Sequence, residues 1–261
     1  MRRSWAEYYN ALSALDRKVG AVLDLLEADG LADSTVVVFL GDHGRAMPRG
    51  KQWCYDSGLR IPMIVREPGG PGGTVRKDLI EAIDLAAQTL AWAGLSPEGL
   101  HGRPFDGPPR RYARGGRDRG DETVDRVRTL RDSRFRYVRN YFPERPWTQL
   151  NRYKRRSYPI VPLMTRLHAE GKLTGPAAAW MAESRPREEL YDTAADPDEV
   201  TNLAADPAYR GHLLRMRSDL EAWLAEVGDE ARFPEDPDAI EAAEMLARRQ
   251  TAKHAKNKAA H

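Results

Sequence analysis

An acid and an imidazole stand side by side directly after an apolar run in this 261-residue sequence. Asp42 and His43 follow the run 35–40 and are flanked by Gly41 and Gly44. A carboxylate oxygen and a neutral imidazole nitrogen are both metal ligands, so this pair is suited to bind one cation at a strand end. Glycine on either side permits close approach of the backbone to a ligand. The alternative is a turn in which the carboxylate caps the following residues and the imidazole is merely exposed.

Three further side chains in the same polar loop could carry chemistry. Lys51 lies eight residues after His43, and a loop of that length can fold back and present an ammonium group to a tetrahedral oxyanion. The alternative is a solvated surface lysine. Arg60 either pairs with a carboxylate that shapes the loop or contacts substrate, and we favour the structural role. Cys54 has no base fixed near it by the sequence, so we favour an inert thiol over a nucleophile.

Composition excludes several classes of protein. The chain has 41 Lys and Arg against 39 Asp and Glu, a net charge of +2, and so lacks the basic excess of nucleic-acid-binding proteins. A single cysteine excludes an internal disulfide framework and a four-cysteine zinc site. Without an apolar run of about 18 residues we expect no transmembrane helix and no membrane partner. The amphipathic N-terminus predicts no secretory signal in the chain as given, and the compartment stays unknown.

The first hundred residues carry the patterns of an α/β fold, which places the Asp-His pair at a strand end. Apolar residues at spacings of three and four predict a helix over residues 4–28. The run 35–40 is apolar without alternation, which is typical of a strand buried on both faces of a parallel sheet. A second strand over 61–65 and a helix over 78–93 follow. Because ligands bind outside the carboxyl ends of strands in such sheets, the pair is placed to contact one.

The pattern changes in the second half of the chain. Residues 96–123 are rich in Pro, Gly, Arg and Asp and predict a long irregular connection. Apolar residues alternate with arginines over 124–141, which predicts an antiparallel hairpin turning at residues 132 and 133. Two short helices are expected over 160–183, an extended piece over 188–192 and an amphipathic helix over 213–227.

These patterns predict three parts, with the main boundary between residues 100 and 122. They are an α/β part (1–108), a smaller α+β subdomain with antiparallel strands and a helix (109–232), and a polar helical or disordered tail (233–261).

Five separated segments together resemble the sulfatase family of the alkaline-phosphatase-like hydrolases, in the family's order. They are "LDRKVGAVLDLLEADGLADSTVVVFLGDHG", "GKQWCYDSGLRIPMIV", "DLAAQTLAWAGLSPEGLHGRPF", "VRTLRDSRFRYVRNYFPERP" and "RPREELYDTAADPDEVTNLAADP". The resemblance covers residues 5–228 and is closest to bacterial glycan sulfatases and heparan N-sulfatase-like members. It implies the C-terminal part of an alkaline-phosphatase-like α/β sandwich followed by a smaller α+β subdomain.

The resemblance also implies roles for individual residues. Asp42 and His43 match the second pair of metal ligands, and the metal in sulfatases is usually calcium. Lys51 matches the catalytic lysine that contacts the sulfate group. Arg60 and Pro62 match an Arg-x-Pro that leads into the next strand. The motif "RDRGDE" falls where this branch has a similar charged motif, and we expect its residues to line the substrate pocket: Arg119, Asp121 and Glu122.

In the family, a formylglycine made from the first residue of a C/S-x-P-x-R motif attacks sulfur while the metal binds the sulfate oxygens. This sequence contains neither form of that motif, and the family's early strand ending in two adjacent aspartates is also absent. The chain therefore resembles the C-terminal half of a sulfatase. Because calcium takes six to eight ligands, a half shell binds weakly, and we expect the chain alone to be inactive on sulfate esters.

Two other interpretations stay open at this stage. One is a phosphonate or phosphate ester hydrolase of the same superfamily, in which the Asp-His pair also occurs. The other is a non-catalytic fragment or one member of a split domain, whose partner is the missing N-terminal half. For a sulfatase we expect a sulfated small molecule or glycan as substrate. A reading frame upstream of Met1 that contains C-x-P-x-R would decide between these interpretations.

Overall fold

A computed structural model of the chain describes residues 2–120, 122–149, 151–232, 236–238, 241–242 and 245. The α-helices are α1 (Arg2–Ala28), α2 (Asp56–Leu59), α3 (Asp84–Trp92), α4 (Arg152–Ser157), α5 (Ile160–Ala169), α6 (Gly175–Trp180) and α7 (Arg210–Glu226). The strands are β1 (Val37–Leu40), β2 (Met63–Arg66), β3 (Ala113–Arg117), β4 (Val127–Arg131), β5 (Phe135–Asn140) and β6 (Glu188–Asp192). Three short 3₁₀ helices complete them: η1 (Ala32–Ser34), η2 (Pro207–Tyr209) and η3 (Glu230–Arg232).

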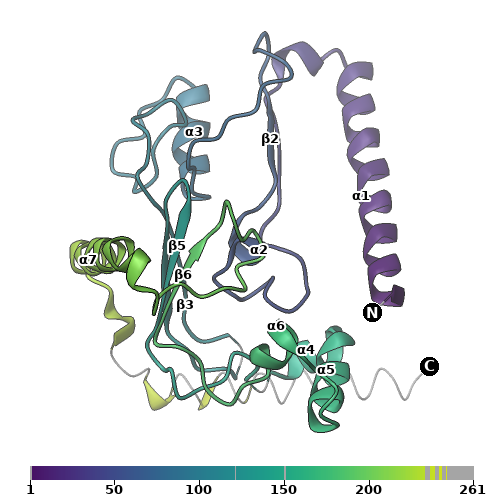
Figure 1. Cartoon of the computed structure of the whole chain (residues 1–261). Helices are drawn as coiled ribbons and strands as arrows, with labels where there is room; N and C mark the ends of the chain where they lie inside the picture. Colours follow the sequence, from purple (N-terminus) through teal and green to yellow (C-terminus); the bar gives the residue numbers. More distant parts are fainter. Residues whose placement is uncertain are drawn as a thin grey trace.

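The N-terminal helix α1 stands at the edge of the molecule, away from the larger sheet (Figure 1). Its apolar stripe confirms the helix predicted from the spacing, but none of its residues is buried. Trp5 and Val19 are half-buried, whereas Val22 on the same stripe is 59 % exposed. The guanidinium of Arg45 lies 5.7 Å from the Trp5 ring and gives the helix one contact with the polar loop.

Strands β1 and β2 form an antiparallel ribbon, with Val37 opposite Arg66 and Leu40 opposite Met63. All four residues of β1 are half-buried, and β2 alternates between half-buried and exposed residues. The prediction of a parallel sheet buried on both faces is therefore wrong for the described strands. A continuous apolar run indicates burial, but it carries no information on the direction of the neighbouring strand.

The second sheet contains four antiparallel strands in the order β3-β4-β5-β6. The hairpin predicted from alternation is confirmed as β4 and β5, and the extended piece as β6. The Asp132 carboxylate accepts hydrogen bonds from the backbone N–H groups of Arg134 at 2.8 Å and Phe135 at 2.6 Å, which fixes the turn. Strand β3 lies within residues 96–123, which were predicted to form an irregular connection because they are rich in Pro, Gly, Arg and Asp. A Cβ on one of its glycines, Gly115, would lie 2.7 Å from the Leu59 side chain, so close packing explains the residue.

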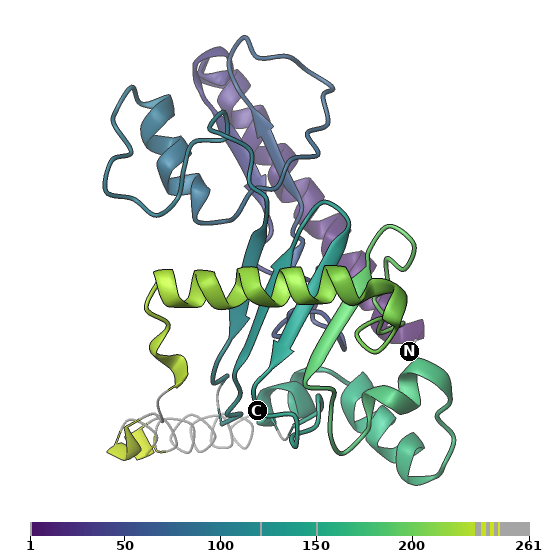
Figure 2. The same cartoon turned by 60° about the vertical axis from the view of Figure 1, so that its left-hand side comes forward.

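Helix α7 lies across one face of this sheet (Figure 2). The largest apolar cluster of the described residues joins the two. Leu130, Tyr137 and Leu190 from three strands pack against Met216 and Leu220 of the helix, and all five are at most 1 % exposed. This burial favours folding by about 1.5–3 kcal/mol per large side chain.

The opposite face of the sheet is covered by the segment that leads into α2 (Figure 1). Cys54 packs there against Val127 of β4 and Val138 of β5. Because both faces are covered, β4 and β5 are buried along nearly their whole length. The arginines that alternate with apolar residues in these strands are therefore mostly inside the protein.

A buried ion network holds this covering segment in place. The Arg136 guanidinium, 3 % exposed, pairs with Asp56 and lies 2.7 Å from the Glu199 carboxylate. Asp56 also pairs with Arg131 at 3.1 Å, and its backbone N–H donates to Glu199 at 2.6 Å. Burial alone would raise the pKa of the Asp56 carboxyl, but Arg136 and Arg131 outweigh it and hold the pKa below its usual value of 3.8.

The remaining helices differ from prediction mainly in their ends. The helix expected over 78–93 is α3, which begins only at Asp84. The helices expected over 160–183 are confirmed as α5 and α6, and the one over 213–227 as α7, whereas α2 and α4 were missed. Most of the predicted tail over 233–261 lies outside the described residues. No described helix is long and apolar enough to cross a membrane.

Replacing Asp56 with Asn should destabilise the protein by about 3–5 kcal/mol, because Arg136 would then be buried beside too little negative charge. Urea unfolding measures this loss. The matched control is Asp78→Asn, which removes an exposed partner of Arg76 and should cost at most about 1 kcal/mol. Equal losses in the two variants would contradict this assignment.

Wild type and the Asp56→Asn variant also test how the stability of the network depends on pH. The folded pKa of Asp56 lies below 3.8, so its stabilisation is fully present above that pH and is lost as the pH falls through the folded pKa. The stability difference between wild type and Asp56→Asn should therefore shrink below pH 4 and not above it.

Candidate functional site

Asp42 and His43 leave the end of β1 and face one another. The Nδ1 atom of His43 lies 2.9 Å from the carbonyl oxygen of Gly44, which can only accept, so Nδ1 carries the hydrogen. A neutral His43 then has its lone pair on Nε2, which lies 3.2 Å from Asp42 Oδ2. Two lone pairs at this distance repel unless a proton or a cation lies between them. Metal–ligand distances of about 2.0–2.6 Å put two ligands of one ion at such a separation.

The pair supplies only part of a coordination shell. Among the described residues, no group of three or more His, Cys, Asp and Glu side chains is placed to bind one metal ion. The Asp42 side chain is 85 % exposed, so its carboxylate is open to further partners. A calcium ion would take its other ligands from elsewhere or from water.

The loop after the pair is folded tightly back on itself. The backbone N–H of Gly44 donates to Gly58 O at 2.9 Å, and that of Lys51 donates to Arg45 O at 2.9 Å. A Cβ at Gly44 or Gly58 would lie within 2.2 Å of a backbone oxygen, so both positions require glycine. The loop is therefore a fixed support for Lys51.

Arg49 anchors the same loop to the second half of the chain. Its backbone is in the left-handed region at φ 64°, and its guanidinium lies 3.8 Å from the centre of the Tyr55 ring. The guanidinium also donates to the carbonyl oxygens of Asp198 and Glu199. Ser57 donates to Arg49 O at 2.6 Å. Loop residues with a strained backbone that is held by several hydrogen bonds are typical of functional sites.

Lys51 is half-buried, and its Nζ atom lies 5.2 Å from the Tyr153 ring on α4. The predicted pocket motif approaches this region, since a Cβ on Gly120 would lie 3.8 Å from the Gln52 side chain. Glu122 accepts from the backbone N–H of Arg152 at 2.6 Å, at the start of α4. Arg119 is half-buried, and Asp121 lies outside the described residues. Their contact with a substrate stays a prediction.

Arg60 is exposed at the end of α2. Its backbone N–H donates to Asp56 O at 2.8 Å. The carboxylate partner that we favoured for its side chain is not found among the described residues.

A cavity of about 260 Å³ opens between the loop and helices α4 to α6. Trp53 and Trp180 form part of its wall, and Met164 and Met181 add apolar surface. Its charged lining is entirely basic and comes from α4: Lys154, whose Nζ lies 3.8 Å above the Trp53 ring, and Arg155. The sequence analysis missed this cavity. The basic run "RYKRRS" was the available signal, but its partners are distant in sequence.

The described residues form a mixed helix and sheet fold with two antiparallel sheets, and comparison with known proteins identifies the family of the chain. A family model described as Sulfatase matches residues 1–95. An ulvan-active sulfatase of Formosa agariphila is 40 % identical over 241 residues, which is 90 % of this chain and 40 % of that protein. Human N-sulphoglucosamine sulphohydrolase is 28 % identical over 251 residues, covering 87 % of this chain and 49 % of that protein. The chain belongs to the sulfatase family.

Solved structures agree on the fold. A 2-O GAG sulfatase superposes with a TM-score of 0.62 at 21 % identity, covering 87 % of this chain and 44 % of that chain. The phosphonate monoester hydrolase of Agrobacterium radiobacter gives 0.55 at 22 % identity, covering 82 % and 40 %. The chain thus spans less than half the length of the curated relatives and of the solved structures described here.

Cys54, the only cysteine, is buried, and burial raises the pKa of its thiol to about 11. This supports the inert thiol favoured from the sequence, since about one molecule in a thousand carries a thiolate at pH 8. We expect a thiol reagent to react with the native protein at least about 100-fold more slowly than with the urea-unfolded chain. Similar rates in both states, with the fold intact by circular dichroism, would contradict the assignment.

Proposed function

We propose that this chain forms part of a sulfatase-type hydrolase in which Asp42 and His43 are metal ligands and Lys51 binds the sulfate group. The observation that carries the proposal is the orientation of His43. Its Nδ1 donates to Gly44 O, and its Nε2 points at the Asp42 carboxylate at 3.2 Å. A hydrogen bond on the other ring nitrogen is the usual way in which a protein orients a ligating histidine.

Lys51 is suited to the second role because its position is fixed. Its backbone is bound to Arg45, and the next residue but one, Trp53, is buried. An ammonium held in place stabilises the charge on a sulfate oxygen more strongly than a mobile one, since no reorganisation is needed during the reaction. A divalent cation held by Asp42 and His43 would supply a second positive charge for the same oxygens.

For the substrate we propose a sulfated glycan. The relatives include an ulvan-active sulfatase and an N-sulphoglucosamine sulphohydrolase, and the basic cavity beside Lys51 suits an acidic sugar. Arg119, Asp121 and Glu122 complete the proposed pocket; its support is that a Cβ on Gly120, in the same motif, would lie 3.8 Å from the Gln52 side chain next to Lys51.

The metal assignment predicts weak but specific cation binding by the 261-residue chain. Calcium should shift the imidazole NMR signals of His43 with a dissociation constant of about 1 mM or weaker, because most of the shell is not protein. Asp42→Ala should abolish the shift. His168→Ala, which removes an exposed imidazole on α5, is the control and should leave it unchanged. An undisturbed His43 signal at high calcium would contradict the assignment.

The activity assignment is tested with 4-nitrophenyl sulfate. The 261-residue chain alone should show no turnover, since it contains no C/S-x-P-x-R motif. If the gene's reading frame continues upstream of Met1, the longer product should hydrolyse the ester. Lys51→Ala should then lower kcat by at least about 100-fold. Lys172→Ala, which changes an exposed lysine paired with Glu170, should not. Faster hydrolysis of a phenylphosphonate ester would favour the phosphonate alternative.

A further inference from the structure

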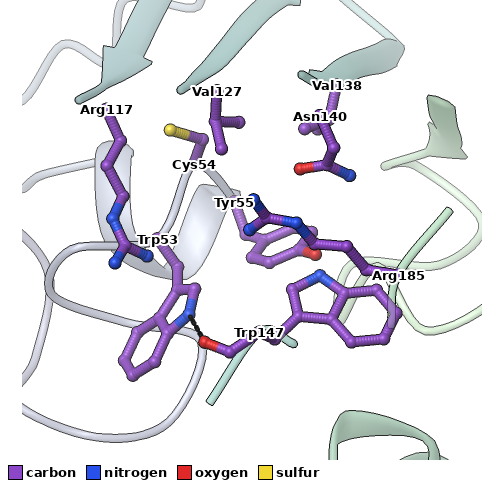
Figure 3. Close-up of a pocket in the computed structure, with 9 residues that line it drawn as sticks. All are labelled: Trp53, Cys54, Tyr55, Arg117, Val127, Val138, Asn140, Trp147 and Arg185. Carbon is purple, nitrogen blue, oxygen red and sulfur yellow. Dashed lines mark hydrogen bonds between the residues drawn. The ribbon is translucent and has the colours of Figure 1, made fainter. Parts of the chain in front are cut away.

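A small cavity lies between the segment that carries Trp53 and the face of the four-stranded sheet (Figure 3). Its volume is about 10 Å³, which is room for one atom the size of a water oxygen. Arg117 enters from β3, and Arg185 enters from the segment before β6. Trp147 and Cys54 also line the cavity.

Four nitrogen donors on residues that line this cavity lack partners, whereas the donors of Trp53, Tyr55 and Asn140 in the same lining already have acceptors. Nε and Nη2 of Arg117, Nε of Arg185 and Nε1 of Trp147 are all buried without an acceptor among the described residues. The side chains of Arg117 and Arg185 are 8 % and 1 % exposed. Burying a donor without an acceptor is unfavourable, and more so when the donor is charged. Four such donors around one cavity indicate a ligand that only accepts.

The charges at the cavity do not cancel. Asp125 is the acidic partner of both guanidinium groups, and Arg185 takes both of its oxygens, one at 2.9 Å. Arg117 is left with a contact of 3.6 Å to the same carboxylate. Burial lowers the pKa of Arg117, and the Cys54 thiol, whose pKa burial raises to about 11, supplies no negative charge at neutral pH. One positive charge therefore stays without a close counter-charge.

We propose that this cavity binds a small monatomic anion of the chloride class between Arg117 and Arg185. A cavity this small favours a monatomic anion over sulfate or phosphate. A water molecule would satisfy two of the donors, but it would bring two hydrogens of its own and no charge. The anion accepts from all of the donors and balances Arg117.

Thermal unfolding in chloride tests the proposal. At constant ionic strength, replacing gluconate by chloride should raise the Tm of the full 261-residue chain by about 3–5 °C per tenfold increase above the dissociation constant. Arg117→Met removes the unbalanced charge and should abolish this dependence. Arg114→Met, on the same strand but outside the cavity lining, is the matched control and should retain it. A chloride dependence that is absent in wild type, or equal in both variants, would overturn the proposal.

Diffraction gives an answer that does not depend on how the variants fold. Crystals grown in bromide should show an anomalous peak between Arg117 and Arg185, within about 3.5 Å of the unpartnered nitrogens. A water without anomalous signal at this point would overturn the proposal. Neither measurement depends on sulfatase activity. A failure of the anion-site proposal can therefore be distinguished from a failure of the proposed function.

Discussion

The buried guanidinium of Arg136 is the constraint on which most of this structure depends. It needs compensating charge, and the protein provides it from two distant places, Asp56 at the start of α2 and Glu199 after β6. Because a buried charge without a partner is far more costly than a missing apolar contact, these ion pairs favour the observed arrangement of the three segments. The loop that carries Lys51 is thus positioned by electrostatics as well as by its glycines.

Much of the larger sheet could be predicted from local patterns, but the role of its arginines could not. The alternation in β4 and β5 gave the hairpin correctly, and the ordinary interpretation of such a pattern is one apolar face and one solvated face. In the structure both faces are covered. Arg128 pairs with Asp229 and Arg136 with Asp56, partners that are 101 and 80 residues away. No local signal identifies such pairs, because any of the chain's 39 acidic residues could serve.

The candidate site shows the same division between local and long-range information. The Asp42–His43 pair was found because both ligands are adjacent and follow an apolar strand. The antiparallel direction of β2 beside β1 could not be predicted, since strand pairing depends on the rest of the fold. The basic cavity was missed because its walls come from the loop and three separate helices. Glycines in β3 suggested a loop, whereas the reason for them is the approach of Leu59 from outside the sheet.

Helix α1 has a consequence for the dynamics of the chain. It spans 27 residues, none of them buried, and the loop contributes one cation–ring contact to it. Local unfolding free energies follow buried contacts, so α1 can open while β4, β5 and α7 stay folded. Its backbone amides should exchange with solvent through such local openings, whereas those of Leu130 and Tyr137 should exchange only when the whole domain unfolds. The Asp-His pair, which follows β1, thus lies between a helix without buried residues and the buried sheet core.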